Sequence, residues 1–449
     1  MRDLLSEIEQ RLDRPTSRGL AAAVSRAVSE RVLAPGTKLP PIRTVAAELA
    51  LSPTTVSAAW SQLTRSGVIR TDGRRGTTVA DGASGGERYK RALGTPVSLA
   101  QDLSTGVPDG ALLPGLGRVL STLETAGTPS SYLEGPVLPD LEALLRRDWP
   151  YQPEALTVVD GAMDALDVVT RTQLRFGDRV VVEHPGFPPV VDLLEALNIE
   201  VIGVPVDDEG LDAAALATAL ARAPVAAVVV QPRAQNPTGV SMTSRRAQHL
   251  ADVLRPTDAL VIEDDSTHGL SRTPPISLGE WLSERTVHIR SFSKSHGPDL
   301  RLAALSASSQ RVHGIEARRH LGQGWSSRLL QRILVGLLTD PEAIAAVVRA
   351  RDVYDERRTL LVDALAEHGI EVGGEEGLNI WVPVHDEAAA IVRLASQGIG
   401  VSAGAPFAVL PEPRGFIRVT AGLVRDRHAE IAAAIAEAAR TGGWGSRAR

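Results

Sequence analysis

The feature that most constrains the fold is an alternation of short apolar runs with Ala- and Leu-rich stretches, from about Gln101 onward. Parallel strands need a long crossover connection, usually a helix, so this alternation predicts an α/β fold with a mainly parallel sheet. The runs that we interpret as strands of this sheet are 156–159, 179–183, 201–204, 225–230, 259–263, 286–291 and 302–307.

The C-terminal part of the chain combines helices and strands in a different way. Its pattern predicts long helices and then a small α+β subdomain, which we place at about residues 340–449. The expected elements are helices at about 310–337, at about 341–367 and from about 426, with strands near 378–384 and 415–420.

The first 80 residues predict a separate winged helix-turn-helix domain. An amphipathic helix is followed by a Pro-Gly break, a second helix, a tight turn, a third helix and a two-stranded hairpin. In the turn, Ser52 is expected to be the N-cap of the third helix and Pro53 its first residue. The helices are expected at 16–32, about 41–49 and 54–66, and the hairpin strands at 68–71 and 77–79.

The third helix and the hairpin carry side chains suited to DNA. Small hydroxyl side chains let a recognition helix approach the major groove, and arginines can contact phosphates or enter the minor groove. Residues 1–86 hold 12 Lys and Arg against 8 Asp and Glu, whereas the rest of the chain holds 36 against 46. The alternative is a protein–protein module with a solvated charged hairpin. The residues expected to contact DNA are Arg43, Ser52, Thr54, Thr55, Ser57, Arg70, Arg74 and Arg75.

Part of this domain resembles the GntR family of bacterial regulators. The positions that match the family pattern are Leu39, Pro40, 42–49, Ser52, Thr55 and Val56. The resemblance implies that Arg43, the third helix and the wing glycine, Gly76, contact double-stranded operator DNA. The domains are therefore expected at 1–80 and 101–449, joined by a linker over 81–100 that begins Gly- and Ser-rich and flexible.

A single lysine follows the apolar run 286–291, in the sequence Ser-Phe-Ser-Lys-Ser. This residue, Lys294, can lose its charge at the end of a buried strand and form a Schiff base. Ser291, Ser293 and Arg301 offer hydroxyl donors and a fixed cation, which a phosphate group requires. The alternative is a surface loop with a solvated lysine.

Five further motifs carry residues that can contact a ligand, and one of them, with Asp264, lies at the carboxyl end of a strand, where open α/β sheets bind ligands. Gly161 precedes a helix whose first N–H groups can bind a phosphate, and Phe187 can stack on a planar ring. A Pro-Gly turn can direct the amide of Asn236 into a cleft. Asp264 ends a strand and can keep a pyridine nitrogen protonated, whereas Arg418 lies in an apolar strand and needs an anionic partner. Each motif also has a purely structural alternative. The glycine and Asn236 motifs can be ordinary turns, Phe187 a core phenylalanine, at least one acid of the Asp264 motif a helix cap, and Arg418 a partner in an internal salt bridge.

The order of these motifs resembles that of the fold-type I pyridoxal-phosphate aminotransferases over about residues 101–441. The resemblance implies bound pyridoxal 5'-phosphate, with Lys294 in the Schiff base and Asp264 at the pyridine nitrogen as the catalytic residues. It also implies Asn236 at the ring oxygen O3′, Phe187 against the ring face and Arg418 on an amino-acid carboxylate. The implied phosphate contacts are Ala162, Met163, Ser291, Ser293 and Arg301.

Joined to a GntR-like head, the whole chain is similar to the MocR-type transcription regulators. The similarity implies a homodimer that binds operator DNA and senses an amine, an amino acid or the cofactor. Ser266 stands where the family usually has a tyrosine that hydrogen-bonds the ring oxygen, so we expect weaker cofactor binding and slow or no transamination. A working aminotransferase with an accessory head and a regulator whose pocket holds no cofactor are the alternatives.

Other classes of site are disfavoured by composition. The chain has no cysteine, which excludes disulfides and thiolate metal ligands, and we expect no metal site. No apolar stretch approaches the length of a membrane helix, and the N-terminus lacks the features of a signal peptide. We therefore expect no membrane partner and a cytoplasmic protein that associates with the nucleoid when bound to DNA.

Overall fold

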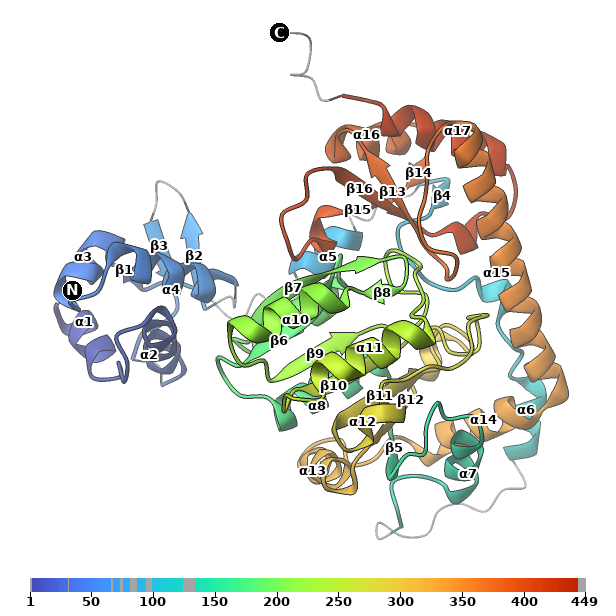
Figure 1. Cartoon of the computed structure of the whole chain (residues 1–449), viewed down its shortest axis with the longest axis horizontal. Helices are drawn as coiled ribbons and strands as arrows, with labels where there is room; N and C mark the ends of the chain where they lie inside the picture. Colours follow the sequence, from blue (N-terminus) through green and yellow to red (C-terminus); the bar gives the residue numbers. More distant parts are fainter. Residues whose placement is uncertain are drawn as a thin grey trace. The chain divides into compact units, whose positions relative to one another are not determined.

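The structure, a computed structural model, describes residues 2–30, 32–65, 68–72, 76–80, 87–93, 99–123 and 134–442. The chain forms two compact units, which we call the head, residues 1–87, and the body, which holds nearly all of the rest. Figure 1 labels their helices and strands. Every helix among the described residues is either too short or too polar to cross a bilayer.

The head is a winged helix-turn-helix, as predicted. Its elements are α1 (Arg2–Glu9), α2 (Ser17–Ser29), β1 (Lys38–Leu39), α3 (Ile42–Glu48), α4 (Pro53–Arg65), β2 (Ile69–Asp72) and β3 (Gly76–Val79). The hydroxyl of Ser52 accepts a hydrogen bond from the backbone N–H of Thr55 at 3.0 Å, which confirms Ser52 as the N-cap of α4. Val56, Trp60 and Leu63 of α4 are buried in the core of the head.

Two elements of the head were not predicted. Helix α1 buries Leu5 and Ile8 against the other helices. Strand β1 adds a third strand to the wing, because Lys38 and Leu39 pair with Thr78 and Thr77 of β3 in an antiparallel ladder. Two residues are too few to show a period of two in the sequence, so only the pairing reveals this strand.

The body contains an eight-stranded sheet of order β5-β12-β11-β10-β9-β6-β7-β8. All seven predicted strands are present with ends shifted by three residues at most, and the short β8 is additional. Strands β6, β9, β10 and β11 run parallel, whereas β12 is antiparallel to both β11 and β5. The strands are β5 (Ala155–Val159), β6 (Arg179–His184), β7 (Glu200–Asp207), β8 (Gly210–Leu211), β9 (Ala227–Val230), β10 (Leu260–Asp265), β11 (Thr286–Ser291) and β12 (Ala303–Ala307).

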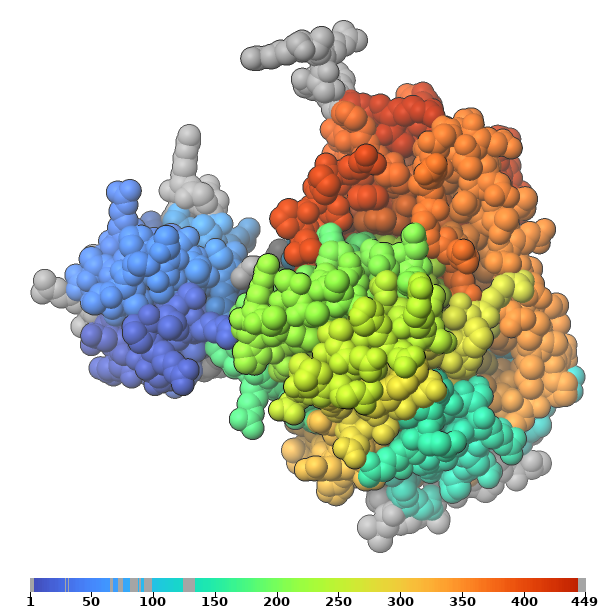
Figure 2. Space-filling view, viewed as in Figure 1, coloured from blue at the N-terminus to red at the C-terminus, as the bar shows by residue number. Residues whose placement is uncertain are grey.

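Helices cover this sheet, as the predicted crossovers require. Helices α10 and α11 bury leucines and alanines against β6, β9 and β10 and form the face seen in green to yellow-green in Figure 2. The helices before the small subdomain are α5 (Glu87–Leu93), α6 (Gly117–Leu123), α7 (Pro139–Arg147), α8 (Ala162–Gln173), α9 (Pro188–Ala196), α10 (Ala213–Arg222), α11 (Ser244–Leu254), α12 (Gly279–Leu282), α13 (Ser309–His320), α14 (Arg328–Thr339) and α15 (Pro341–Glu367).

Two helical expectations are corrected by the structure. The helical pattern at 310–337 is two helices, α13 and α14, because Gly322 and Gly324 interrupt it and Gly324 has a φ of +73°. The expected linker contains a helix, α5, which packs on the body. The Arg88 guanidinium donates to the carbonyl of Ala408 at 3.0 Å, and Ser402 donates to the carbonyl of Ala92.

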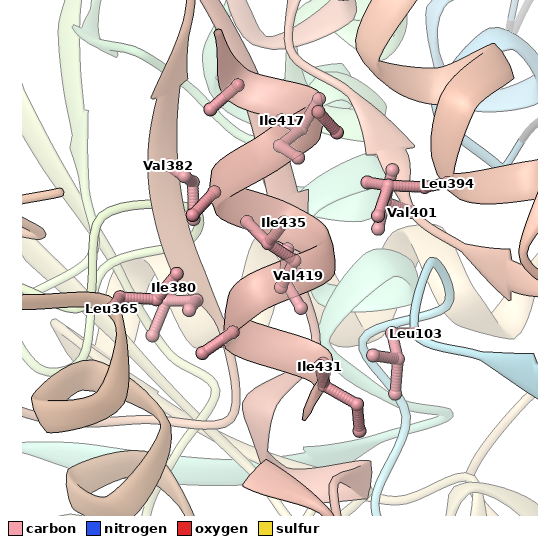
Figure 3. Packing of buried hydrophobic residues seen from close by; sticks show 14 of the residues in the cluster. Leu103, Leu365, Ile380, Val382, Leu394, Val401, Ile417, Val419, Ile431 and Ile435 are labelled. Carbon is pink, nitrogen blue, oxygen red and sulfur yellow. The ribbon is translucent and has the colours of Figure 1, made fainter. Parts of the chain in front are cut away.

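The small subdomain also contains a segment from the start of the body. Strand β4 (Gln101–Asp102) pairs with β14 (Ile399–Gly400), and Leu103 enters the core shown in Figure 3. Helix α15 runs from the end of α14 into this subdomain (Figure 1). Its other elements are β13 (Ile380–Val384), α16 (Glu387–Ser396), β15 (Ser402–Ala403), β16 (Gly415–Val419) and α17 (His428–Ala439), with the sheet order β13-β16-β15.

Candidate functional site

Lys294 lies in the loop after β11, a strand that is buried along its whole length. Its side chain is half-buried, and its ammonium donates a hydrogen bond to the carbonyl of Gly106. Burial lowers the pKa of Lys294 to about 8; the nearby Arg418 adds to this effect and Asp264 opposes it. The neutral amine, the nucleophilic form, is therefore much more populated near neutral pH than in an ordinary lysine.

Asp264 is the next-to-last residue of β10, a strand that lies between the parallel strands β9 and β11. Its Oδ2 accepts a hydrogen bond from Nε2 of Gln231 at 2.8 Å, whereas its buried Oδ1 has no hydrogen-bond partner among the described residues. Burial raises the pKa of Asp264 to about 6, against the hydrogen bond from Gln231. A buried acceptor without a donor is costly, and a pyridinium N–H is a donor that fits it.

Asn236 lies in the turn after β9, and other side chains fix its amide. Its backbone N–H donates to Oε1 of Gln231 at 2.9 Å. Its side-chain oxygen accepts from Arg418 at 3.4 Å and from Asn379 at 3.5 Å. Because both neighbours use the amide oxygen, the NH2 group is the part of Asn236 that can donate to a ligand oxygen.

A seat for a phosphate group lies where β5, β11 and β12 meet. The register places Ser291 opposite Ala303, and Ala303 opposite Val159. Gly161, two residues after β5, and Arg301, two residues before β12, therefore lie at the same edge of the sheet. Gly161 is the N-cap of α8 with a φ of +101° and no capping side chain, and a Cβ there would lie 3.5 Å from the Arg301 guanidinium carbon. No described residue accepts a hydrogen bond from Arg301. A helix N-terminus beside a free guanidinium is suited to a phosphate.

The other predicted phosphate contacts lie around this seat. Ala162 and Met163 are the first two residues of α8, Ser291 is the last residue of β11, and Ser293 lies in the loop that leads to Lys294. The hydroxyl of Ser291 accepts a hydrogen bond from the backbone N–H of Ser293 at 3.3 Å, so Ser293 lies close to the end of β11. The unpartnered carboxylate oxygen, the half-buried lysine and the anion seat together fit pyridoxal phosphate.

Arg418 comes from β16 of the small subdomain and is 4% exposed. Its guanidinium donates to the carbonyl of Ser104 as well as to Asn236, and it lies 5.1 Å from the ring centroid of Phe407. Gly106 has a φ of +64°, and a Cβ there would lie 3.3 Å from this guanidinium. The segment 104–106 therefore accepts hydrogen bonds from both Arg418 and Lys294.

Phe187 is a predicted contact of the ring face, and Ser266 stands at the position of the family's usual tyrosine. Phe187 is half-buried between β6 and α9, and none of the described aromatic residues stacks on it, so its contact with the cofactor ring stays a prediction. Ser266 is the first residue after β10 and is half-buried, and its hydroxyl makes no hydrogen bond with a described residue. The individual roles of all these residues toward the cofactor likewise stay predictions.

The predicted DNA-contacting residues of the head are mostly exposed. Arg43, Ser52, Thr54, Ser57 and Arg70 are exposed, and Thr55 is half-buried. The hydroxyl of Ser52 also contacts those of Thr54 and Thr55, at 2.7 and 2.8 Å. Gly76 has a φ of +93° at the start of β3, and Arg74 and Arg75 lie outside the described residues.

The structure adds residues that the sequence analysis missed. Gln231, Asn379 and the carbonyls of Ser104 and Gly106 all contact predicted site residues. Only Gln231 had a sequence signal, because it directly follows a buried strand at the ligand-binding edge of the sheet. In the head, the sequence analysis missed Lys38 as a close neighbour of Gly76. If Gly76 carried a Cβ, that atom would lie 3.1 Å from Cε of Lys38.

We expect Ser266→Tyr to tighten cofactor binding up to about tenfold, because a phenol can reach the ring oxygen and a neutral hydrogen bond contributes about 0.5–1.5 kcal/mol. Titration of the variant with pyridoxal phosphate, followed by visible absorbance, measures the effect. Ser266→Phe is the matched control, since it adds the ring without the hydroxyl. Equal affinity of the Tyr and Phe variants would contradict the expectation.

Comparison with known proteins bears on both units. The family described as aminotransferase class I and II matches residues 101–435, and the gntR family of bacterial regulatory proteins matches residues 16–79. The vitamin B6 salvage pathway transcriptional repressor PtsJ of Salmonella typhimurium is 35% identical over 405 residues, covering 88% of this chain and 92% of PtsJ. The pyridoxine biosynthesis regulator PdxR of Corynebacterium glutamicum is 28% identical, covering 78% of each chain.

Solved structures resemble the body. Kynurenine aminotransferase of Pyrococcus horikoshii superimposes with a TM-score of 0.69 at 21% identity, covering 77% of this chain and 92% of the enzyme. The α-aminoadipate aminotransferase LysN of Thermus thermophilus gives the same TM-score at 22% identity, covering 84% and 97%. At this identity the likeness establishes the fold of the body and not its reaction.

Proposed function

The chain is a MocR-type transcription regulator of the GntR family, its body belongs to the aminotransferase class I and II family, and we propose that it binds pyridoxal phosphate at Lys294. In this proposal, binding of the cofactor controls how the head binds operator DNA. The proposal rests above all on the unpartnered Oδ1 of Asp264 beside a lysine of lowered pKa. Lys294 is also the only lysine from residue 91 to the C-terminus.

The residues of the site suit each part of this cofactor. Bound pyridoxal phosphate supplies an aldehyde for condensation with an amine and an electron-withdrawing ring. Asp264 would hold the ring nitrogen protonated, Asn236 would donate to the ring oxygen, and Arg301 with the N-terminus of α8 would bind the phosphate. Lys294 and Arg418 would exchange their hydrogen bonds to the segment 104–106 for contacts with ligands.

We propose the cofactor itself as the principal effector. PtsJ is named for vitamin B6 salvage and PdxR for pyridoxine biosynthesis, and these names support a vitamin B6 signal over an unrelated amino acid. Arg418, buried and equipped to bind a carboxylate, supports an amino acid or another amine as a second ligand. It also supports residual aminotransferase activity as the second candidate function, with Ser266 limiting its rate.

The proposed regulator acts as a homodimer in the cytoplasm, on operator DNA. Exposed apolar side chains on two adjoining helices support a self-association surface: Leu116 and Leu120 at α6 and Leu329 of α14 are 43%, 46% and 59% exposed. Exposed apolar patches of this kind mark interaction surfaces, and closed two-fold dimers are the commonest oligomers. Sedimentation of the purified protein measures this state.

The decisive experiment is operator binding with and without pyridoxal phosphate. A duplex selected by the purified protein from random sequences serves as the probe, and fluorescence anisotropy gives its affinity. We expect pyridoxal phosphate to change the affinity of the wild type and to leave that of Lys294→Ala unchanged. Saturation of Lys294 without any change in operator affinity would contradict control by the cofactor.

We expect Arg43→Ala to weaken binding of the selected duplex by about 1–3 kcal/mol if the arginine reads a base edge. If Arg43 contacts only a phosphate, the slope of log K against log salt should fall by about 0.9 instead. Arg147→Ala, which removes an exposed arginine of the body, is the matched control. The cofactor spectrum should not change, and unaltered affinity and slope would place Arg43 outside the interface.

A further inference from the structure

Gln231 occupies the position directly after β9, and its side chain joins two predicted contacts of the cofactor ring. Its Nε2 donates to Oδ2 of Asp264 at 2.8 Å, and its Oε1 accepts the backbone N–H of Asn236 at 2.9 Å. Its own N–H donates to Oε2 of Glu183 at 3.2 Å. The residue is 7% exposed, so these bonds form away from solvent.

These two side-chain bonds fix the orientation of the amide. An amide has one acceptor end and one donor end, and here each end is engaged by a different group. Because Gln231 binds Oδ2 of Asp264, the other carboxylate oxygen is the one left without a partner among the described residues. Because it also accepts the backbone N–H of Asn236, one side chain hydrogen-bonds both predicted ring contacts.

Resting on the proposed function, we propose that Gln231 is a positioning residue, which presents Asp264 and Asn236 to the pyridine ring and keeps Asp264 ionised. The side-chain N–H of Gln231 lowers the free energy of the carboxylate form of Asp264, whereas burial and the adjacent Asp265 raise it. An ionised Asp264 can hold the ring nitrogen protonated, while a neutral one cannot. Gln231 thus acts on the ring without touching it.

The chain offers a matched control in the same turn. Gln235 is 1% exposed and also uses both ends of its amide. Its Nε2 donates to the carbonyl of Pro185 at 2.8 Å, and its Oε1 accepts from the hydroxyl of Thr238 at 2.7 Å. Its side chain bonds neither Asp264 nor Asn236, so its loss should affect stability without a direct effect on the ring.

The experiment compares Gln231→Met with Gln235→Met, because methionine keeps the length of glutamine and removes its hydrogen bonds. Each variant is titrated with pyridoxal phosphate, and its visible spectrum and thermal unfolding are recorded. Hydrogen bonds to charged groups are worth about 1.5–3 kcal/mol, so Gln231→Met should weaken cofactor binding about tenfold to a hundredfold. Its visible band should also change at constant pH, since the proton moves from the ring nitrogen toward Asp264.

Gln235→Met should keep the wild-type band and an affinity within about twofold, even if it unfolds at a lower temperature. If Gln231→Met does not fold, the isosteric Gln231→Glu replaces it; its carboxylate beside Asp264 should weaken binding at least as strongly. Equal affinities and spectra for the variants at 231 and 235 would overturn the proposal. Failure of the wild type itself to bind the cofactor would instead refute the proposed function.

Discussion

Replacement of Lys294 by alanine should abolish the covalent adduct that borohydride traps between pyridoxal phosphate and the protein. The chain has only three lysines, Lys38, Lys90 and Lys294, and the first two are exposed in the wing and on α5. Lys294 combines partial burial, a lowered pKa and the neighbouring Asp264. The expected loss is therefore complete, and mass spectrometry of the digested adduct measures it.

Lys90→Ala is the matched control and should retain the full adduct. A trapped adduct on Lys38 or Lys90 in the wild type, at a stoichiometry near one per chain, would contradict the assignment. The pH dependence provides an independent check. Because the pKa of Lys294 is lowered to about 8, the neutral amine increases as the pH rises through about 8, and the rate of adduct formation should increase over the same range.

Replacement of Asp264 by alanine should weaken cofactor binding by more than about tenfold, since loss of one partner of a buried charged pair costs about 2–5 kcal/mol. In the protein without cofactor, the buried Oδ1 of Asp264 has no hydrogen-bond partner among the described residues. The group that loses an acceptor in the alanine variant is therefore the ring nitrogen of the cofactor. Titration by visible absorbance measures the affinity. Asp208→Ala, which removes an exposed acid, is the control and should bind as the wild type does.

The isosteric variant Asp264→Asn tests the same residue through stability. Burial raises the pKa of Asp264 to about 6, so its folded-state carboxylate is destabilised relative to the unfolded chain. The stability that this group contributes is present below its unfolded pKa of 3.8 and is lost as the pH rises through about 6. Without cofactor, Asp264→Asn should therefore unfold at a higher temperature than the wild type above pH 6.

That stability difference should shrink as the pH falls through about 6, whereas cofactor binding by Asp264→Asn should be poor at every pH. A residue that is unfavourable for folding but required for the ligand is typical of a functional site. An Asn variant that is less stable than the wild type above pH 6 would indicate that Asp264 has a structural role instead. Differential scanning fluorimetry across the pH range distinguishes the two outcomes.

Much of the fold could be predicted because its signals are local. Each of the seven predicted strands is a short apolar run bounded by turn residues, and Ser52 with Pro53 marks the start of α4 within two positions. Lys294, Asp264 and Asn236 could be assigned as candidates for the same reason, since each lies in a short motif at the end of a strand. In contrast, α1, β1 and the docked helix α5 were missed because each is only two to eight residues long and is held in place by packing or pairing with distant segments.

The sequence by itself determined the two folds, their order and the residues with chemistry to offer, because periodicity, caps and turn residues act over a few neighbouring positions. Only the tertiary structure decided how those residues are paired. Gln231 meets Asp264 across 33 positions, and Lys294 meets the carbonyl of Gly106 across 188. Such contacts depend on strand register and on the path of the chain between strands, and a hydrogen bond requires that path to be correct to a fraction of an ångström.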